Sequence, residues 1–177
     1  MATEVEKGQE AEIRLGTTAD RGELLAMYQG FEPKAASLGL PPHSQLEQWI
    51  AGLAPFLNFL AYADGKLVGH AVLCPEGDAG EVAVFVHQDF RGRGIGRRLL
   101  ATLLEQARRM GLRKAWGMTE PDNLPLLRLV RTLGFVQDRQ KDPYLFSLNL
   151  DVADEQAMAG LSKPGEAILP PLAGSDC

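Results

Sequence analysis

The apolar positions along the chain repeat with two different periods, which predict an ordered series of strands and helices. Alternation in EIRLGTT, residues 12–18, predicts a first strand, and two apolar runs joined around Asp64-Gly65, residues 58–76, predict a hairpin. The near-continuous apolar run GEVAVFVH, residues 80–87, predicts a central strand. Further short strands are expected at residues 113–120, 135–140 and 144–150.

Helical spacing of apolar residues occurs in four other segments, at residues 19–31, 43–54, 95–112 and 123–135. The third is the strongest, and its apolar stripe consists of Ile95, Leu99, Leu103, Ala107 and Met110. Thr18 or Asp20 is suited to cap the first helix, and Gly111 and Gly134 are suited to end the last two.

The predicted order is therefore strand, two helices, three strands, helix, strand, helix and two strands. This order describes a mixed sheet with helices on both faces, which is an α/β or α+β layer fold. We expect one folded domain at residues 11–150, between a flexible start at 1–10 and a tail at 151–177 that is rich in Pro, Gly, Ala and Ser.

Composition and charge narrow the classes of function. The chain has 177 residues, of which 45% are hydrophobic and 23% charged, as is typical of a globular protein. A net charge of −5 argues against a nucleic-acid partner, but eight Lys or Arg and one acid lie between Arg91 and Lys114, which suits a discrete polyanionic ligand.

Cys74, Cys177 and the scattered histidines offer no metal spacing, so no bound metal is expected. The acidic start and the lack of a long apolar run predict a cytoplasmic protein without membrane contact.

The stretch VFVHQDFRGRGIGRRLL, residues 84–100, has the features of a phosphate site. Gly92, Gly94 and Gly96 lie between the central strand and the strongest helix, where backbone N–H groups are free and the helix dipole is positive. A Walker A loop is rejected because Arg97-Arg98 replaces its Lys-Ser/Thr. A dinucleotide-binding turn fits poorly because the third glycine comes one residue early.

Arg91-Gly92-Arg93-Gly94-Ile95-Gly96, followed by LVRTLGF at residues 129–135, resembles the two landmarks of the GNAT (Gcn5-related) N-acetyltransferases. The resemblance spans about residues 11–150. It implies a mostly antiparallel sheet that is splayed at the cofactor site, with acetyl-CoA as the acyl donor. It also implies that backbone N–H groups of residues 92–97 hold the pyrophosphate, that Arg91 and Arg93 add charge, and that pantetheine pairs with the backbone of residues 84–86.

The cofactor-binding residues that this resemblance implies are Val84, Phe85, Val86, Arg91, Gly92, Arg93, Gly94, Ile95, Gly96 and Arg97. Asn123 stands where the family often has an asparagine that touches the cofactor arm. The alternative for Asn123 is the N-cap of a helix, and the two interpretations carry about equal weight.

Glu81, at the start of the central strand, is the leading candidate for a general base. A lysine amine has a pKa of about 10.4 and is mostly protonated at pH 7, so acetyl transfer needs a proton acceptor near the thioester. The alternative is an edge glutamate that faces water, and His87 and Cys74 rank below Glu81.

The family implies that a strand N–H near Phe85 holds the oxyanion. Val130 stands where many GNAT enzymes have a tyrosine, which leaves the general acid unassigned.

Three longer stretches, residues 80–100, 111–135 and 146–150, resemble more narrowly the acetyltransferase domain of bacterial protein-lysine acetyltransferases. This resemblance implies acetylation of a lysine in a protein such as an acyl-CoA synthetase, by direct attack of the amine on the thioester. Alternatives are acetylation of a small-molecule amine, or an acetyl-CoA-binding sensor without turnover. Whether the protein is a monomer or a dimer stays open.

Overall fold

A six-stranded mixed sheet forms the centre of the protein, with its strands in sequence order from one edge to the other. The computed structural model describes residues 10–32, 40–137 and 140–151. All neighbouring strands pair antiparallel except β4 and β5, which are parallel. The strands are β1 (Glu12–Leu15), β2 (Leu57–Ala63), β3 (Lys66–Glu76), β4 (Ala79–Val86), β5 (Lys114–Met118) and β6 (Leu145–Asn149). The predicted mixed, mostly antiparallel sheet is confirmed.

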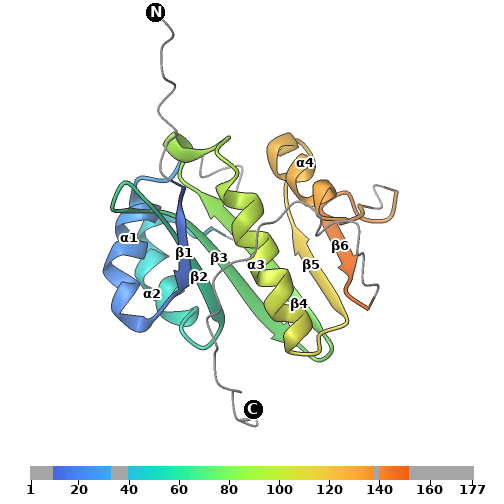
Figure 1. The fold of residues 1–177 in the computed structure, drawn as a ribbon. Helices are drawn as coiled ribbons and strands as arrows, with labels where there is room; N and C mark the ends of the chain where they lie inside the picture. The colour runs from blue at the N-terminus through green and yellow to red at the C-terminus, as the bar shows by residue number, and fades with distance from the viewer. Residues whose placement is uncertain (1–9, 33–39, 138–139, 152–177) are drawn as a thin grey trace, which may run out of the picture.

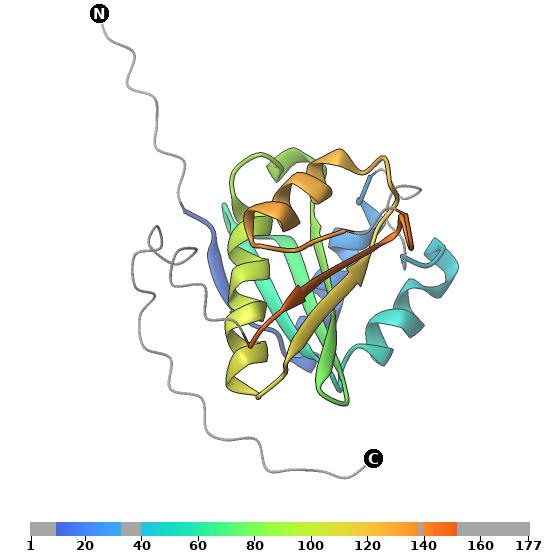
Figure 2. The same cartoon turned by 90° about the vertical axis from the view of Figure 1, so that its right-hand side faces the viewer.

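Helices cover both faces of this sheet, as predicted (Figure 1). On one face lie α1 (Arg21–Gln29) and α2 (Leu46–Gly52), whose apolar residues pack against Leu60 of β2 and Phe85 of β4. On the other face lie α3 (Ile95–Arg109) and α4 (Leu124–Thr132), which share a larger core with the opposite side of the strands. Figure 2 shows these two helical layers on opposite sides of the sheet. Short 3-10 turns are η1 (Thr18–Asp20), η3 (His43–Gln45) and η4 (Gln88–Phe90).

Local sequence signals placed most of these elements correctly. The Asp64-Gly65 turn has positive φ at both residues, as a two-residue hairpin turn requires. Gly111 and Gly134 follow α3 and α4 with positive φ, so both helix ends are confirmed. Asp20 is the N-cap residue of α1, although its side chain makes no capping hydrogen bond.

Two expectations about the second half of the chain are wrong. Met110 is 40% exposed, because α3 ends at Arg109 and Met110 forms its C-cap outside the core. The strand expected at residues 135–140 is reduced to one bridge between Val136 and Ser147, and residues 138–139 lie outside the described part of the chain. Residues 1–9 of the expected flexible start, and all of the expected tail except Asp151, also lie outside it.

Within the described ranges, no helix is both long and apolar enough to cross a membrane.

A buried hydrogen-bonded chain ties α1 to β3 and β2 beneath the first helical layer. The Tyr28 hydroxyl lies 2.6 Å from Nδ1 of His70, and Nε2 of His70 lies 2.9 Å from Oδ1 of Asn58. Because the asparagine oxygen can only accept, Nε2 carries the proton and Nδ1 accepts from Tyr28. Asn58 in turn donates to the carbonyl oxygens of Leu53 and Phe56. Burial lowers the pKa of His70 to about 4 and raises that of Tyr28, so both groups are neutral at pH 7.

We expect this chain to make stability depend on the protonation of His70. The folded-state pKa lies below the value of about 6.5 in the unfolded chain, so the unfolded state binds the proton more strongly. Stability should therefore fall by about 3 kcal/mol between pH 7 and pH 4. Urea unfolding at a series of pH values measures this loss, which should be much smaller in His70→Gln but retained in His43→Gln, whose histidine is exposed. An equal loss in His70→Gln would assign it to other groups.

Candidate functional site

The parallel pairing of β4 with β5 ends early, and this opens the sheet at its centre. The paired residues are Ala79 with Lys114, Gly80 with Ala115, and Glu81 with Trp116, whereas β4 continues to Val86. Beyond Glu81 the edge of β4 no longer faces β5. The splayed sheet expected from the resemblance is therefore present, and it leaves backbone N–H and C=O groups of β4 available to a ligand.

Gly117 of β5 marks the point of divergence. A Cβ at this residue would lie 2.6 Å from the carbonyl oxygen of Val82 and 2.5 Å from the ring of Phe146. Only glycine permits this close approach of β5 to β4 and β6, after which the two parallel strands separate.

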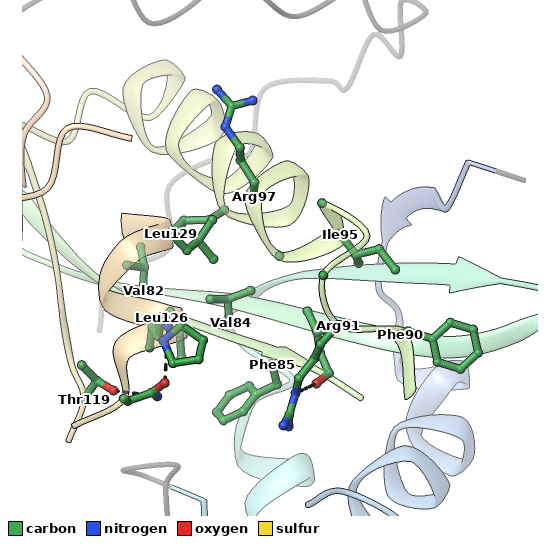
Figure 3. Close-up of a pocket in the computed structure, with 18 of the residues that line it drawn as sticks. Val82, Val84, Phe85, Phe90, Arg91, Ile95, Arg97, Thr119, Leu126 and Leu129 are labelled. Carbon is green, nitrogen blue, oxygen red and sulfur yellow. Dashed lines mark hydrogen bonds between the residues drawn. The ribbon is translucent and has the colours of Figure 1, made fainter. Parts of the chain in front are cut away.

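A cavity of about 600 Å³ occupies the gap between β4, α3 and α4 (Figure 3). Its walls are mainly apolar, and they come from β4, from the start of α3 and from α4. The lining residues include Phe31, Val82, Ala83, Val84, Phe85, Val86, Phe90, Arg91, Gly92, Gly94, Ile95, Gly96, Arg97, Leu100, Met118, Thr119, Asp122, Asn123, Pro125, Leu126, Leu129 and Phe146. Nine of the ten cofactor-binding residues implied by the glycine motif, and Asn123, are brought together here.

The glycine turn forms one end of the cavity. Gly92 and Gly94 both have positive φ, at 75° and 77°, and Gly94 is the N-cap residue of α3. A Cβ at either glycine would meet nothing within 4 Å, so the space above the turn is open. The first N–H groups of α3 have no partner within the helix and lie at its positive end. The turn can therefore bind an anion, as its sequence predicts.

Both motif arginines are held by contacts within the protein, and the charge that they would add at a bound pyrophosphate stays a prediction. Arg93 does not line the cavity, since its guanidinium lies 4.8 Å from the centroid of the Phe90 ring and donates to the Asp89 carbonyl oxygen at 3.3 Å. Arg91 does line it, but Nε donates to the Val86 carbonyl oxygen at 2.9 Å and Nη2 to that of Glu32 at 2.6 Å. Desolvation lowers the pKa of Arg91. Both side chains are thus engaged with the protein.

Asn123 serves as the N-cap of α4. Its Oδ1 accepts from the N–H of Leu126 at 3.3 Å, and its Nδ2 donates to Oγ1 of the buried Thr119 at 3.0 Å. The helix-capping interpretation is therefore correct. Because Asn123 also lines the cavity, a contact with a bound ligand stays a prediction.

Glu81 lies next to the cavity rather than in its wall. It precedes Val82, and strand alternation places its side chain on the same face as Phe85, which is the face that carries α1 and α2. The residue is exposed, but partial burial and then the charge of Glu76 raise its pKa. The geometry suits a proton acceptor that reaches the cavity from the α1/α2 face.

The other candidates for acid–base chemistry are less well placed. Cys74 pairs with Glu81 across β3 and β4, and burial followed by the Glu81 charge raises its pKa to about 11, so it is a thiol at neutral pH. His87 is the N-cap residue of η4 and accepts the N–H of Asp89. Val130 of α4 is buried in the core and does not line the cavity.

Phe31, Thr119 and Phe146 are cavity residues that the sequence did not indicate. Thr119 lies near the end of the strand expected at residues 113–120, which is a local signal for a residue at an edge of a sheet. Phe31 and Phe146 come from segments 50 or more residues away from the glycine motif. No pattern in the sequence links them to it.

Comparison with known proteins agrees with this geometry. The model of the acetyltransferase (GNAT) family matches residues 22–135, which is more than half of the chain. The L-amino acid N-acyltransferase MnaT of Escherichia coli is 40% identical over 60 residues, but this match spans only 34% of the chain and 35% of that protein.

Solved structures show the same fold. The ribosomal-protein-alanine N-acetyltransferase of Brucella melitensis superimposes with a TM-score of 0.65 and 28% identity, over 78% of this chain and 99% of its own. The structure of yncA from Salmonella typhimurium with its cofactor acetyl-CoA superimposes with a TM-score of 0.64 and 22% identity, over 81% of this chain and 96% of its own. The narrower resemblance to protein-lysine acetyltransferases is not confirmed by these relatives.

Proposed function

The chain belongs to the acetyltransferase (GNAT) family, and on this basis we propose that it transfers the acetyl group of acetyl-CoA to a primary amine. One observation carries the proposal. The paired part of β4 ends at Glu81, and the unpaired edge that follows leads through an apolar cavity to the anion-binding turn. A long ligand fits these three features. Its anionic end would bind the turn, its amide groups would pair with the unpaired edge of β4, and its reactive far end would lie near the end of pairing at Glu81.

The residues of the cavity match the parts of acetyl-CoA. Pyrophosphate would accept hydrogen bonds from N–H groups of the turn and of Ile95, Gly96 and Arg97 at the start of α3. The pantetheine amides would pair with the open edge of β4 at residues 84–86, as a short added strand. Arg97 lines the cavity and makes no hydrogen bond or ion pair within the described ranges, so its charge is available to the phosphates.

Glu81 would act as the general base, directly or through a water molecule. The acceptor amine attacks the thioester carbonyl from the α1/α2 face and passes its proton toward Glu81, whose raised pKa favours this role. A β4 N–H beside Phe85, at Val84 or Val86 on the open edge, would stabilise the negative charge on the carbonyl oxygen. The CoA thiolate then leaves, and with a pKa of about 8.5 it needs little help from an acid.

The acceptor has two candidates. A small amine of the amino-acid type is favoured by the activity named for the Escherichia coli relative. A lysine of a protein such as an acyl-CoA synthetase is favoured by three exposed apolar side chains, Met118, Leu124 and Tyr144. Met118 lines the cavity, and Leu124 begins α4 beside it, so they offer a surface for a protein loop.

We expect Gly94→Asp to abolish binding of acetyl-CoA. The substitution strains a backbone with φ of 77° and places a negative charge over the phosphate site. Isothermal calorimetry should show at least a hundredfold weaker binding. Gly65→Asp is a matched control, because Gly65 also has positive φ and open space but lies in the β2–β3 turn away from the cavity. Unchanged affinity in Gly94→Asp would remove the phosphate site from this turn.

The two acceptors differ in how they respond to salt. Release of CoA thiol should be measured with L-methionine, L-phenylalanine and a purified acyl-CoA synthetase, at low and high ionic strength. A small acceptor should turn over at a rate that changes little with salt, whereas acetylation of a folded protein should slow as salt rises. Thiol release with none of these acceptors, despite tight binding of acetyl-CoA, would support a sensor without turnover.

Glu81→Gln should lower kcat by a factor of about 10²–10⁴ while acetyl-CoA still binds, because glutamine keeps the shape but cannot accept the proton. In the wild type, kcat/KM should rise with pH through a pKa above the ordinary glutamate value. In the variant, the residual rate should keep rising at alkaline pH as the amine loses its own proton. His87→Gln is the control for a base at the other end of β4. An undiminished rate in Glu81→Gln near pH 7 would place the base elsewhere.

A further inference from the structure

The segment that ends α1 is fastened to the residues that precede the glycine turn. Gln88 of η4 uses both ends of its amide, since Oε1 accepts the N–H of Glu32 at 3.0 Å and Nε2 donates to the carbonyl oxygen of Gly30 at 2.8 Å. Arg91 adds a third bond, from Nη2 to the Glu32 carbonyl oxygen at 2.6 Å. These three bonds flank a single residue, Phe31.

The side chain of Phe31 is fixed as firmly as its backbone. Its ring lies 5.9 Å from that of Phe85 and 6.1 Å from that of Tyr28, measured between centroids in tilted or edge-to-face contact. The Arg91 guanidinium lies 5.1 Å from the ring centroid on another side. Phe31 is only 3% exposed, yet it lines the cavity. Such a ring cannot turn aside without breaking several contacts.

Phe31 and Phe85 together form the wall of the cavity on the α1/α2 face. If pantetheine pairs with residues 84–86 and an N–H of this open edge beside Phe85 holds the thioester oxygen, the acyl group lies beside these two rings. An acyl group that extends toward the face of Glu81 then meets Phe31.

We propose that Phe31 is a specificity-determining residue that limits the acyl donor to short chains, and that Gln88 is its positioning residue. This inference rests on the proposed function. Acetyl-CoA fits in front of the ring, whereas a six-carbon acyl chain would have to displace it. Gln88 acts only through Phe31, because its amide bonds hold the backbone on both sides of that residue.

The test compares the affinities of free CoA, acetyl-CoA, butyryl-CoA and hexanoyl-CoA by isothermal calorimetry. The wild type should bind hexanoyl-CoA at least tenfold more weakly than acetyl-CoA. Phe31→Ala should reduce this ratio to within about threefold, and Gln88→Met, which keeps the volume of the side chain but loses both hydrogen bonds, should give an intermediate ratio. Phe31→Leu provides a milder change in case the alanine variant does not fold. Phe56→Ala is the control, since Phe56 is an exposed phenylalanine outside the cavity.

The ratio of two acyl-CoA affinities separates this proposal from the proposed function. A general loss of folding or of phosphate binding weakens all four ligands together and leaves the ratio unchanged. A ratio that is equal in the wild type and in Phe31→Ala, or a wild type that binds hexanoyl-CoA as tightly as acetyl-CoA, would overturn the role of Phe31 alone. A wild type that binds no form of CoA would overturn both proposals.

Discussion

The end of pairing between β4 and β5 is the constraint on which the site depends. Strand backbone groups inside a protein need hydrogen-bond partners, and β4 has them on its β5 side only as far as Glu81. Gly117 sets this limit, because its missing side chain lets β5 approach the Val82 carbonyl and the Phe146 ring at the last point of contact. The free edge beyond that point is the one part of β4 that a ligand backbone can complete.

Alternation along β4 gives each face of the opened sheet a different task. Val82, Val84 and Val86 point toward α3 and α4, where the turn at Gly92–Gly96 can hold the anionic end of a donor. Glu81 and Phe85 point toward α1 and α2, where an acceptor can approach. The donor and the acceptor can thus lie on opposite faces of one strand, in contact with neighbouring residues of β4. This separation results from the alternation of side chains along the strand and needs no additional helix or strand.

Those features that depend on neighbouring residues were predictable from the sequence. The Asp64-Gly65 hairpin, the apolar stripe of α3 and the glycine turn are short-range signals, and the structure shows all three. The position of Phe31 was not predictable, because it results from bonds between residues 58 and 59 positions apart, such as Gln88 with Gly30 and Arg91 with Glu32. The strand expected at residues 135–140 failed for a similar reason. In the described part of this segment only Val136 pairs, with Ser147 of β6. Strand propensity alone does not show how many residues of a partner strand are free to pair.

The motif arginines show that the charge of a sequence segment does not reveal which side chains are free to contact a ligand. Arg91 and Arg93 give the turn its basic sequence, yet each guanidinium lies near an aromatic ring and donates to backbone carbonyl groups. Hydrogen bonds to an anion can come from the N–H groups of the turn and of α3, whose dipole adds to the attraction, and from Arg97, while the charges of Arg91 and Arg93 act from beside the turn. Backbone N–H groups are fixed by the helix, so they bind a phosphate without losing side-chain entropy. Arg91 also fastens the end of α1 to the glycine turn, because it donates to the Glu32 carbonyl oxygen and lies beside the Phe31 ring, and this couples two walls of the cavity.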